Sequence, residues 1–221
     1  MSSPTDCCDV APSSPISQTP RMAQNQQKSP LASPNPSTAD VDAGGLHVAI
    51  IGTGAGGVAA ALKAAGLGAR VTLIEGGELI GGTCVNAGCV PSKIMIRAAH
   101  ITHQQAHHPF SGISARPPDI DRAALVAQQQ ARVAELRQAK YADVLAKHPN
   151  IDVVRGWARF HPTEPGADGL QLRVRLRDGS EQIVNPDRVL IATGARPSVP
   201  PLSGLIDTPF WTSTDALVAP V

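Results

Sequence analysis

The pattern of apolar and polar positions changes sharply at about residue 46. Residues 46–51 (LHVAII) form a short apolar run that is typical of a buried strand. A glycine-rich stretch follows, then an alanine-rich helical segment that ends near Gly68, and then a second apolar run at residues 70–75 (RVTLIE). A strand, a helix and a strand in this order predict a βαβ unit with parallel strands.

Two further segments have helical patterns, residues 92–107 and residues 121–147. In the second segment, apolar residues recur on one face when the chain turns by about 100° per residue. This face comprises Leu125, Val133, Leu136 and Val144. Asp121 is a suitable N-cap and Pro149 ends the pattern, so we expect one continuous helix over this segment.

Short apolar runs in the second half of the chain predict several strands. These are residues 151–160, 170–177, 183–184 and 188–192. An Asp178-Gly179 turn joins the second and third of them, which favours a small antiparallel meander. Residues 197–209 are a proline-rich loop. The expected fold class is α/β, a Rossmann-like domain with a parallel sheet and a small antiparallel β-meander.

Composition excludes several classes of protein. Of the 221 residues, 42% are apolar and 17% charged, which is enough for a packed core. The 19 basic and 18 acidic side chains give a net charge of +1, too balanced for coating nucleic acid or an anionic membrane. No apolar run reaches the roughly 18 residues of a membrane-spanning helix, and no secretory signal is visible. We therefore expect no nucleic-acid or membrane partner and a cytoplasmic location.

Residues 1–45 differ from the rest of the chain. They are rich in proline and serine and contain no aromatic residue, so they cannot bury enough apolar surface to offset the entropy of ordering. We expect a disordered tail, followed by one folded domain over residues 46–221. The tail carries Cys7 and Cys8, which are either a soft-metal ligand pair or, as we favour, an incidental exposed pair.

The glycines Gly52, Gly54 and Gly57 match the GxGxxG pattern of dinucleotide-binding turns. The pattern alone is weak, but here a strand precedes it and a helix follows it. Glu75 ends the second strand, where an acidic residue accepts hydrogen bonds from the adenosine ribose. The pyrophosphate would lie at the helix N-terminus, and the pattern does not distinguish NAD from FAD.

Two further cysteines, Cys84 and Cys89, are five residues apart. On a regular helix they would point away from each other, but Gly88 and Pro91 favour a distorted helix start that brings the sulfurs together. The helix dipole and Lys93 would favour a thiolate. The pair is therefore a candidate dithiol that cycles with a disulfide.

Two metal-site hypotheses are weaker. A zinc site at these cysteines lacks a second pair of ligands, and we reject it. The other hypothesis rests on three histidines that share a helical face but have no cysteine or carboxylate beside them in sequence, so a polar helix face is favoured. These are His100, His103 and His107.

The stretch from Gly81 to Lys93 (GGTCVNAGCVPSK) resembles the redox-active signature of the pyridine nucleotide–disulfide oxidoreductases. Residues 94–101, 128–132 and 211–217 are similar to the mercuric reductase branch of that family. The resemblance extends from about residue 46 to the end of the chain. It implies an FAD-binding domain whose electrons come from NADPH, with Hg(II) as the substrate and a homodimer as the complete enzyme.

The resemblance also implies roles for individual residues. Cys84 would be the interchange thiol that meets the substrate, and Cys89 the charge-transfer thiolate against the flavin. Together they would bind Hg(II) transiently, and Lys93 would lie beside the flavin ring. The implied FAD contacts are Gly52, Gly54, Gly56, Gly57, Glu75, Gly77, Thr83, Cys84, Lys93, Ala158, Thr193 and Gly194.

The chain departs from the family in its extent. Complete relatives continue into NADPH-binding and dimerisation domains, so we expect an N-terminal FAD-domain fragment with little NADPH turnover of its own. Two alternatives remain open. One is a dihydrolipoamide dehydrogenase-like or other disulfide reductase, and the other is a non-catalytic module that binds flavin or sequesters metal through its thiols.

Overall fold

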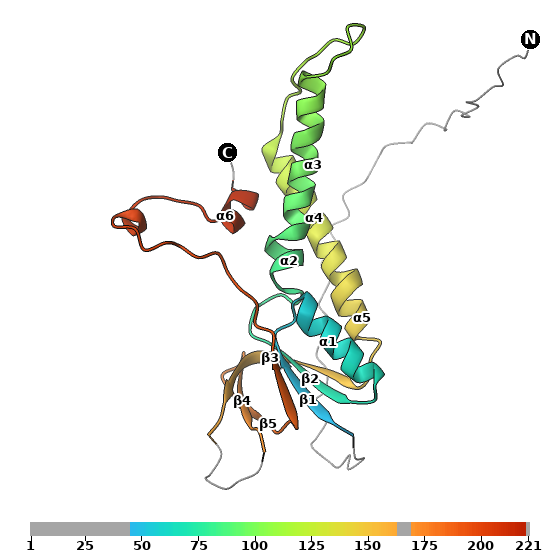
Figure 1. The fold of residues 1–221 in the computed structure, drawn as a ribbon, viewed down its shortest axis with the longest axis vertical. Helices are drawn as coiled ribbons and strands as arrows, with labels where there is room; N and C mark the ends of the chain where they lie inside the picture. Colours follow the sequence, from blue (N-terminus) through green and yellow to red (C-terminus); the bar gives the residue numbers. More distant parts are fainter. Residues whose placement is uncertain (1–44, 163–168, 220–221) are drawn as a thin grey trace, which may run out of the picture. The chain divides into compact units, whose positions relative to one another are not determined.

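The computed structural model of the chain describes residues 45–162 and 169–219. The expected tail, apart from its last residue, and the Cys7–Cys8 pair therefore lie outside the described residues. The described part is a mixed α/β domain, which confirms the predicted fold class (Figure 1).

A six-stranded sheet has the order β5-β4-β3-β2-β1-β6. Its strands are β1 (His47–Ile51), β2 (Arg70–Glu75), β3 (Ile151–Phe160), β4 (Leu172–Leu176), β5 (Glu181–Val184) and β6 (Arg188–Ile191). β1 pairs in parallel with β2 and β6, and β2 pairs in parallel with β3. The β3–β4 and β4–β5 pairs are antiparallel and form the predicted meander.

Strand β3 belongs to both parts of the sheet. Residues 151–155 pair with β2, and residues 156–160 pair with β4. Gly156 lies at the change, where a Cβ atom would be 2.6 Å from the carbonyl oxygen of Arg175. Only glycine permits this close approach of the two strands.

Each face of the parallel strands contributes to a separate core cluster. Helix α1 (Ala55–Gly66) packs with one face, on which Ile50 and Leu73 are fully buried. The adjacent residues Ala49 and Ile74 point to the opposite face, where they pack with the meander. The meander residues in that cluster are Leu172, Val174 and Val184.

The helical segment predicted over residues 121–147 is interrupted. It consists of α4 (Arg122–Arg137), a π-helical turn η1 (Gln138–Ala142) and α5 (Asp143–Leu145). A π turn bonds i to i+5 and so takes in one more residue than an α turn. The buried face therefore shifts by one position: Leu145 is buried and Val144 is only half-buried. The predicted cap is confirmed, because the Asp121 side chain accepts a hydrogen bond from the Ala124 amide at 2.9 Å.

The helix predicted to begin at Ser92 begins earlier. Helix α2 (Gly82–Ala87) and helix α3 (Cys89–Ala106) follow each other and are separated only by Gly88. The sequence analysis also missed helix α6 (Ser213–Val218), which has a capping box between Thr212 and Asp215. Beyond β6, the described chain otherwise contains only a short 3-10 turn, η2 (Leu205–Asp207).

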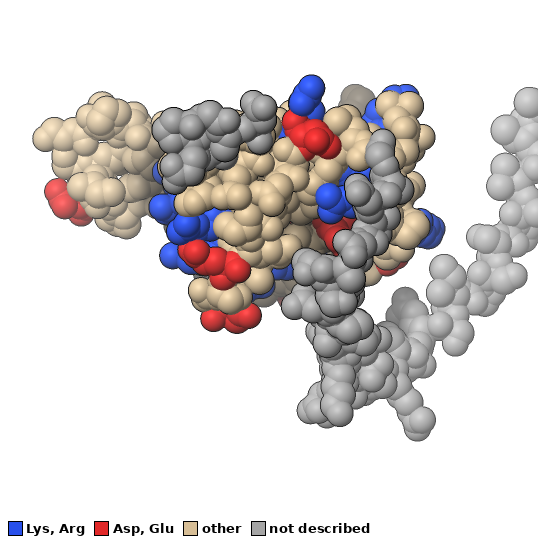
Figure 2. Space-filling view, turned by 90° about the horizontal axis from the view of Figure 1, so that it is seen from below, with Lys and Arg blue, Asp and Glu red and all other residues tan. Residues whose placement is uncertain are grey.

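Acidic and basic side chains are interspersed on the face shown in Figure 2, without an extended patch of one sign. Among residues 45–162 and 169–219, no helix is both long enough and apolar enough to span a bilayer.

His47, at the start of β1, is a buried titratable group. Its Nε2 atom lies 2.8 Å from the Thr72 hydroxyl, and its Nδ1 atom lies 2.9 Å from the Arg70 guanidinium. Burial lowers the pKa of His47 below its ordinary value of 6.5, and the charge of Arg70 acts in the same direction. The unfolded chain therefore binds a proton more readily than the folded one.

We expect this histidine to make stability depend on pH. Its contribution should be complete above about pH 6.5 and should be lost as the pH falls through the lower pKa of the folded state. Chemical denaturation between pH 5 and pH 8 measures the effect, with His47→Asn as the comparison. The variant should show a shallower dependence on pH, and an unchanged slope would contradict the assignment.

Candidate active site

The predicted glycine motif lies at the carboxyl ends of the parallel strands. Gly52 follows β1 and donates its amide to the carbonyl of Ile74 in β2 at 2.8 Å. Helix α1 begins three residues later, with Gly54 as its N-cap. Ligands of open α/β sheets bind at this edge, and the unpaired amides of a helix N-terminus attract phosphate.

Two of these glycines are required by close backbone packing. Gly52 has φ +111°, and a Cβ atom there would lie 2.2 Å from the carbonyl oxygen of Ala192 after β6. A Cβ atom on Gly57 would lie 2.1 Å from the carbonyl oxygen of Gly52. The backbone is thus drawn into a tight turn in front of the first amides of α1, which is the arrangement that binds a pyrophosphate, so the residues present fit a dinucleotide.

The Glu75 carboxylate is fixed by three donors. Its Oε1 atom accepts from the Gly77 amide at 2.6 Å, and its Oε2 atom accepts from both the amide and the hydroxyl of Thr53. Thr53 is fully buried. Carboxylate oxygens have further lone pairs, so the held group can still accept hydrogen bonds from a ribose. The sequence analysis missed Thr53, which occupies a variable position of the motif.

The dithiol segment packs directly on the glycine turn. A Cβ atom on Gly82 would be 2.6 Å from the Cα atom of Gly54. The amide of Gly81 donates to both the carbonyl and the hydroxyl oxygen of Thr53 at 3.1 Å. On the other side, the Thr83 hydroxyl donates to the Ala195 carbonyl at 3.2 Å. The structure therefore brings together the predicted phosphate site, the start of the dithiol segment and the chain after β6.

Cys84 lies in α2 and Cys89 is the first residue of α3, and both are free thiols. Gly88, with φ −132° and ψ −108°, interrupts the helix between them, at the point where the sequence predicts a distortion. A hydrogen bond with the side chain of Cys89 is the main cause that raises the pKa of Cys84, and burial adds to it.

The predicted effect of Lys93 agrees in direction with the pKa of Cys84, but other groups decide the net shift. The charge of Lys93 does lower the pKa of Cys84. However, the hydrogen bond with Cys89 and burial outweigh it, so the net shift is upward.

Tyr141 is a residue of this site that the sequence did not reveal. It lies in the π turn η1, and its ring carbons would be 3.6 Å from a Cβ atom on Gly81. Burial raises the pKa of Tyr141, and the charges of Cys84 and Cys89 act in the same direction. At neutral pH the phenol stays protonated and can donate a hydrogen bond. The position of Tyr141 depends on the π turn, and the sequence pattern does not predict that turn.

Buried and half-buried polar side chains hold the two dithiol helices in place. Asn86 donates to the carbonyls of Ile80 and Gly82 at 2.9 Å, and Arg137 donates to Asn86 at 2.9 Å. Gln129 is fully buried and donates to the carbonyl of Pro91 at 3.1 Å.

The remaining predicted residues lie on α1, on α3, in the loop after β6 and in the meander. Gly56 is in the first turn of α1, Lys93 is one helical turn after Cys89, and Gly194 is in the loop after β6 with Thr193. Ala158 lies further away along the chain, opposite Val174 in the meander.

The histidines of α3 do not converge on a metal. The rings of His103 and His107 stack with centroids 4.6 Å apart. Among the described residues, no group of three or more histidine, cysteine or acidic side chains is arranged to hold a metal ion.

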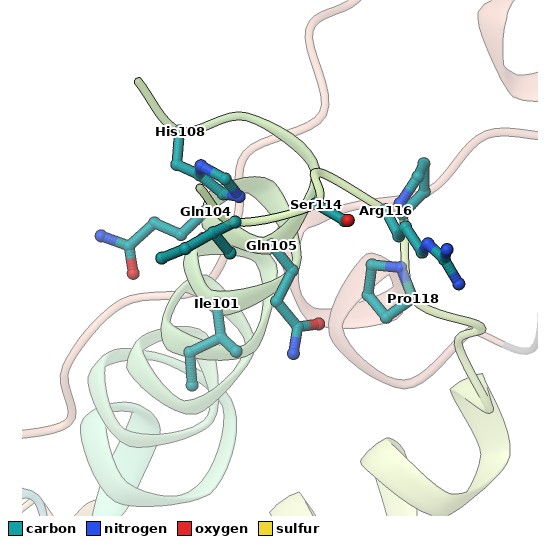
Figure 3. Close-up of a pocket in the computed structure, with 9 residues that line it drawn as sticks. Ile101, Gln104, Gln105, His108, Ser114, Arg116 and Pro118 are labelled. Atoms are coloured by element: carbon teal, nitrogen blue, oxygen red, sulfur yellow. The ribbon is translucent and has the colours of Figure 1, made fainter. Parts of the chain in front are cut away.

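Two hollows lie along helix α3, and the larger one is also lined by α4. One, of 810 Å³, begins at Lys93 and is also lined by Arg97 and Arg132. The other, of 510 Å³, lies at the far end of α3, where Gln105 and His108 face Pro118 (Figure 3). Neither cysteine of the dithiol lines either hollow, and the first comes nearest in sequence, at Lys93.

A glycine turn against a helix N-terminus, a fixed carboxylate and an adjacent dithiol define a dinucleotide-binding redox domain. Residues 46–219 match the pyridine nucleotide-disulphide oxidoreductase family over most of the chain. The chain belongs to that family.

Curated relatives are mercuric reductases. The enzyme of Shigella flexneri is 60% identical over 177 residues, covering 80% of this chain and 30% of that protein. The enzyme of Shewanella putrefaciens is 47% identical over 219 residues, covering 99% of this chain and 34% of that protein. The chain therefore spans about a third of the length of these relatives.

Solved structures show the same fold. The HOCl-induced flavoprotein disulfide reductase RclA from Escherichia coli aligns with a TM-score of 0.59 and 31% identity over 77% of this chain and 33% of that one. LpdA from Mycobacterium tuberculosis aligns with a TM-score of 0.59 and 29% identity, covering 71% of this chain and 33% of that one.

Proposed function

We propose that this chain is the FAD-binding, dithiol-bearing part of a mercury(II) reductase. The observation that carries the proposal is the packing of the Cys84–Cys89 segment on the glycine turn, through the 2.6 Å approach at Gly82 and Gly54. The identity of 60% to a mercuric reductase favours Hg(II) over other substrates. The net reaction of the complete enzyme would be Hg(II) + NADPH giving Hg(0), NADP⁺ and H⁺.

FAD would be held by residues at the carboxyl edge of the sheet. The amides at the start of α1 would receive the pyrophosphate, and Glu75, fixed by Thr53 and Gly77, would receive the adenosine ribose. Gly56, Lys93, Ala158, Thr193 and Gly194 complete the proposed contacts. When bound, FAD supplies the transfer of an electron pair from NADPH towards the substrate.

The two cysteines would bind the substrate and place it. Hg(II) is a soft cation, and thiolates are the softest ligands in proteins. Metal binding requires thiolates, so it would release the proton of Cys84 and remove the hydrogen bond with Cys89 that raises the pKa of Cys84. In this proposal Cys84 meets the incoming ion first, Cys89 lies on the flavin side, and the Tyr141 hydroxyl donates to a thiolate.

Reduction of a disulfide is a second candidate function. It is favoured by the likeness to a flavoprotein disulfide reductase, at a TM-score of 0.59, and by the accessible Cys89. In that case Cys84 would attack the substrate disulfide. The main proposal also includes NADPH as the electron donor, a homodimer and a cytoplasmic location. These rest on the family resemblance and the cysteine content.

The purified chain should contain FAD that heat releases, and absence of FAD from folded protein would overturn the proposal. The FAD-loaded chain should next be photoreduced without excess reductant and mixed anaerobically with Hg(II). We expect mercury vapour and recovery of flavin absorbance, whereas Zn(II) should give neither. Recovery with a small disulfide but not with Hg(II) would replace the main proposal by the second candidate.

A further inference from the structure

Trp157 lies on the backbone beside the fixed carboxylate. A Cβ atom on Gly76 would be 2.9 Å from Cδ2 and 3.0 Å from Cε2 of the Trp157 indole. Gly76 immediately follows Glu75, so its missing side chain provides the space in which the indole lies. Yet Trp157 remains 63% exposed, an unusual state for the largest apolar side chain.

The indole shares a face of the sheet with charged groups of the proposed ribose site. Glu75 and Arg155 are direct partners in the parallel β2–β3 pair, so their side chains point to the same face. Trp157 lies two residues after Arg155 and therefore also points to that face. Arg177 donates to the Gly77 carbonyl at 2.6 Å and so links the end of β4 to the segment that follows Glu75.

The order of the strands gives the direction of a bound dinucleotide. The phosphate-binding turn follows β1, and the ribose carboxylate ends β2, the next strand in the sheet. Continuing in that direction from the ribose leads to β3, which carries Trp157 just beyond its parallel part. The group attached to the ribose on that side is adenine.

We propose that the Trp157 indole is the surface against which the adenine of bound FAD stacks. Every base has a π-face, and an exposed indole held against a glycine backbone offers a rigid partner for it. This inference deepens the proposed function and rests on it, because the ligand is the same FAD. Trp157 is a positioning residue, remote from the dithiol and its chemistry.

Affinity measurements on the full chain, freed of bound flavin, test the stack. Trp157→Ala should weaken FAD binding by about 5- to 150-fold, the effect expected for one aromatic–base stack. Trp157→Phe should restore most of it, because a ring is retained. FMN, which lacks the adenosine half, should bind the wild-type chain and Trp157→Ala equally.

Gly76→Ala provides a matched variant, because its methyl group would displace the indole without removing it. It should weaken FAD binding in the wild-type background and have no further effect in Trp157→Ala. Fluorescence gives a readout independent of affinity for the flavin. In Trp211→Phe the remaining tryptophan is Trp157, and ADP should quench its fluorescence in a saturable manner.

The outcomes separate the two proposals. Equal FAD affinity in wild type and Trp157→Ala, or an equal loss for FMN, overturns the stacking inference and leaves FAD binding in place. A wild-type chain that binds no FAD overturns the proposed function and this inference with it.

Discussion

Gly57→Ala is expected to abolish FAD binding and to destabilise the domain. The added methyl group would lie 2.1 Å from the carbonyl oxygen of Gly52, and neither backbone segment can yield because Gly52 itself packs against Ala192. Overpacking of this kind costs about 1–3 kcal/mol or more. At about 2–4 °C per kcal/mol for a domain of this size, the melting temperature should fall measurably.

Gly56→Ala is the matched control, because nothing lies within 4 Å of a Cβ atom on Gly56. Alanine favours a helix over glycine by about 1 kcal/mol, so the flavin-free variant should melt at or above the wild-type temperature. Thermal unfolding of the flavin-free proteins compares the two variants, and FAD retained after purification compares Gly57→Ala with the wild type, because Gly56 is itself a proposed FAD contact. Equal melting temperatures for the two variants would mean that the turn relaxes and that its tight packing is not needed.

Replacing either cysteine of the dithiol is expected to weaken Hg(II) binding by about 10²- to 10⁴-fold. The second thiolate binds an ion already held by the first, so its loss removes the advantage of an intramolecular ligand. A serine hydroxyl is too hard a ligand to replace it. Cys84→Ser and Cys89→Ser should be compared in a chain whose Cys7 and Cys8 are also serine, by competition with a monothiol.

Tyr141→Phe is the control for this experiment, because it retains both sulfurs and removes only a hydroxyl near them. Its Hg(II) affinity should change by about tenfold or less, the worth of one ordinary hydrogen bond, because bound Hg(II) neutralises the thiolate that accepts it. If the single-cysteine variants also kept affinity within tenfold, Hg(II) would not be chelated by this pair, and the assignment of the substrate site would fail.

The parts of the site that the sequence predicted are those whose residues are close together in the chain. The glycine turn, Glu75 and the Cys84–Cys89 pair each depend on a strand, a turn and a helix in immediate succession, and such local patterns can be read directly. Thr53 was missed for a different reason: it occupies a variable position, and its role follows only from the bonds it makes to Glu75 and Gly81.

Tyr141 shows why the other residues of the site could not be predicted from the sequence. A constant turn of about 100° per residue, projected past Arg137, puts Val144 on the buried face. The π turn adds a residue, so the face continues at Leu145 instead, and Tyr141 lies near the dithiol. Whether a helix accommodates such a residue depends on its packing partners, here the dithiol segment, which are distant in the sequence.

Helix α6 is a similar case. Side chains of α4, distant in sequence, donate hydrogen bonds to the carbonyl groups of this six-residue helix. Arg122 donates to the carbonyls of Ala216 and Leu217, and Gln129 donates to that of Leu217 at 3.4 Å. An isolated segment this short is not stable as a helix, so tertiary contacts and not local propensity decide it.

The position of β6 beside β1 has a consequence for the order of events during synthesis. Val48 pairs with Arg188, so the edge of the sheet next to the glycine turn is completed only after residue 191 has left the ribosome. The meander and the β1–α1–β2 unit consist of neighbours in sequence and can form earlier. Ala192, whose carbonyl packs on Gly52, is thus synthesised after all the other residues that form the glycine turn. A nascent chain halted before that residue should therefore fail to capture flavin, even though every glycine of the motif has already been made.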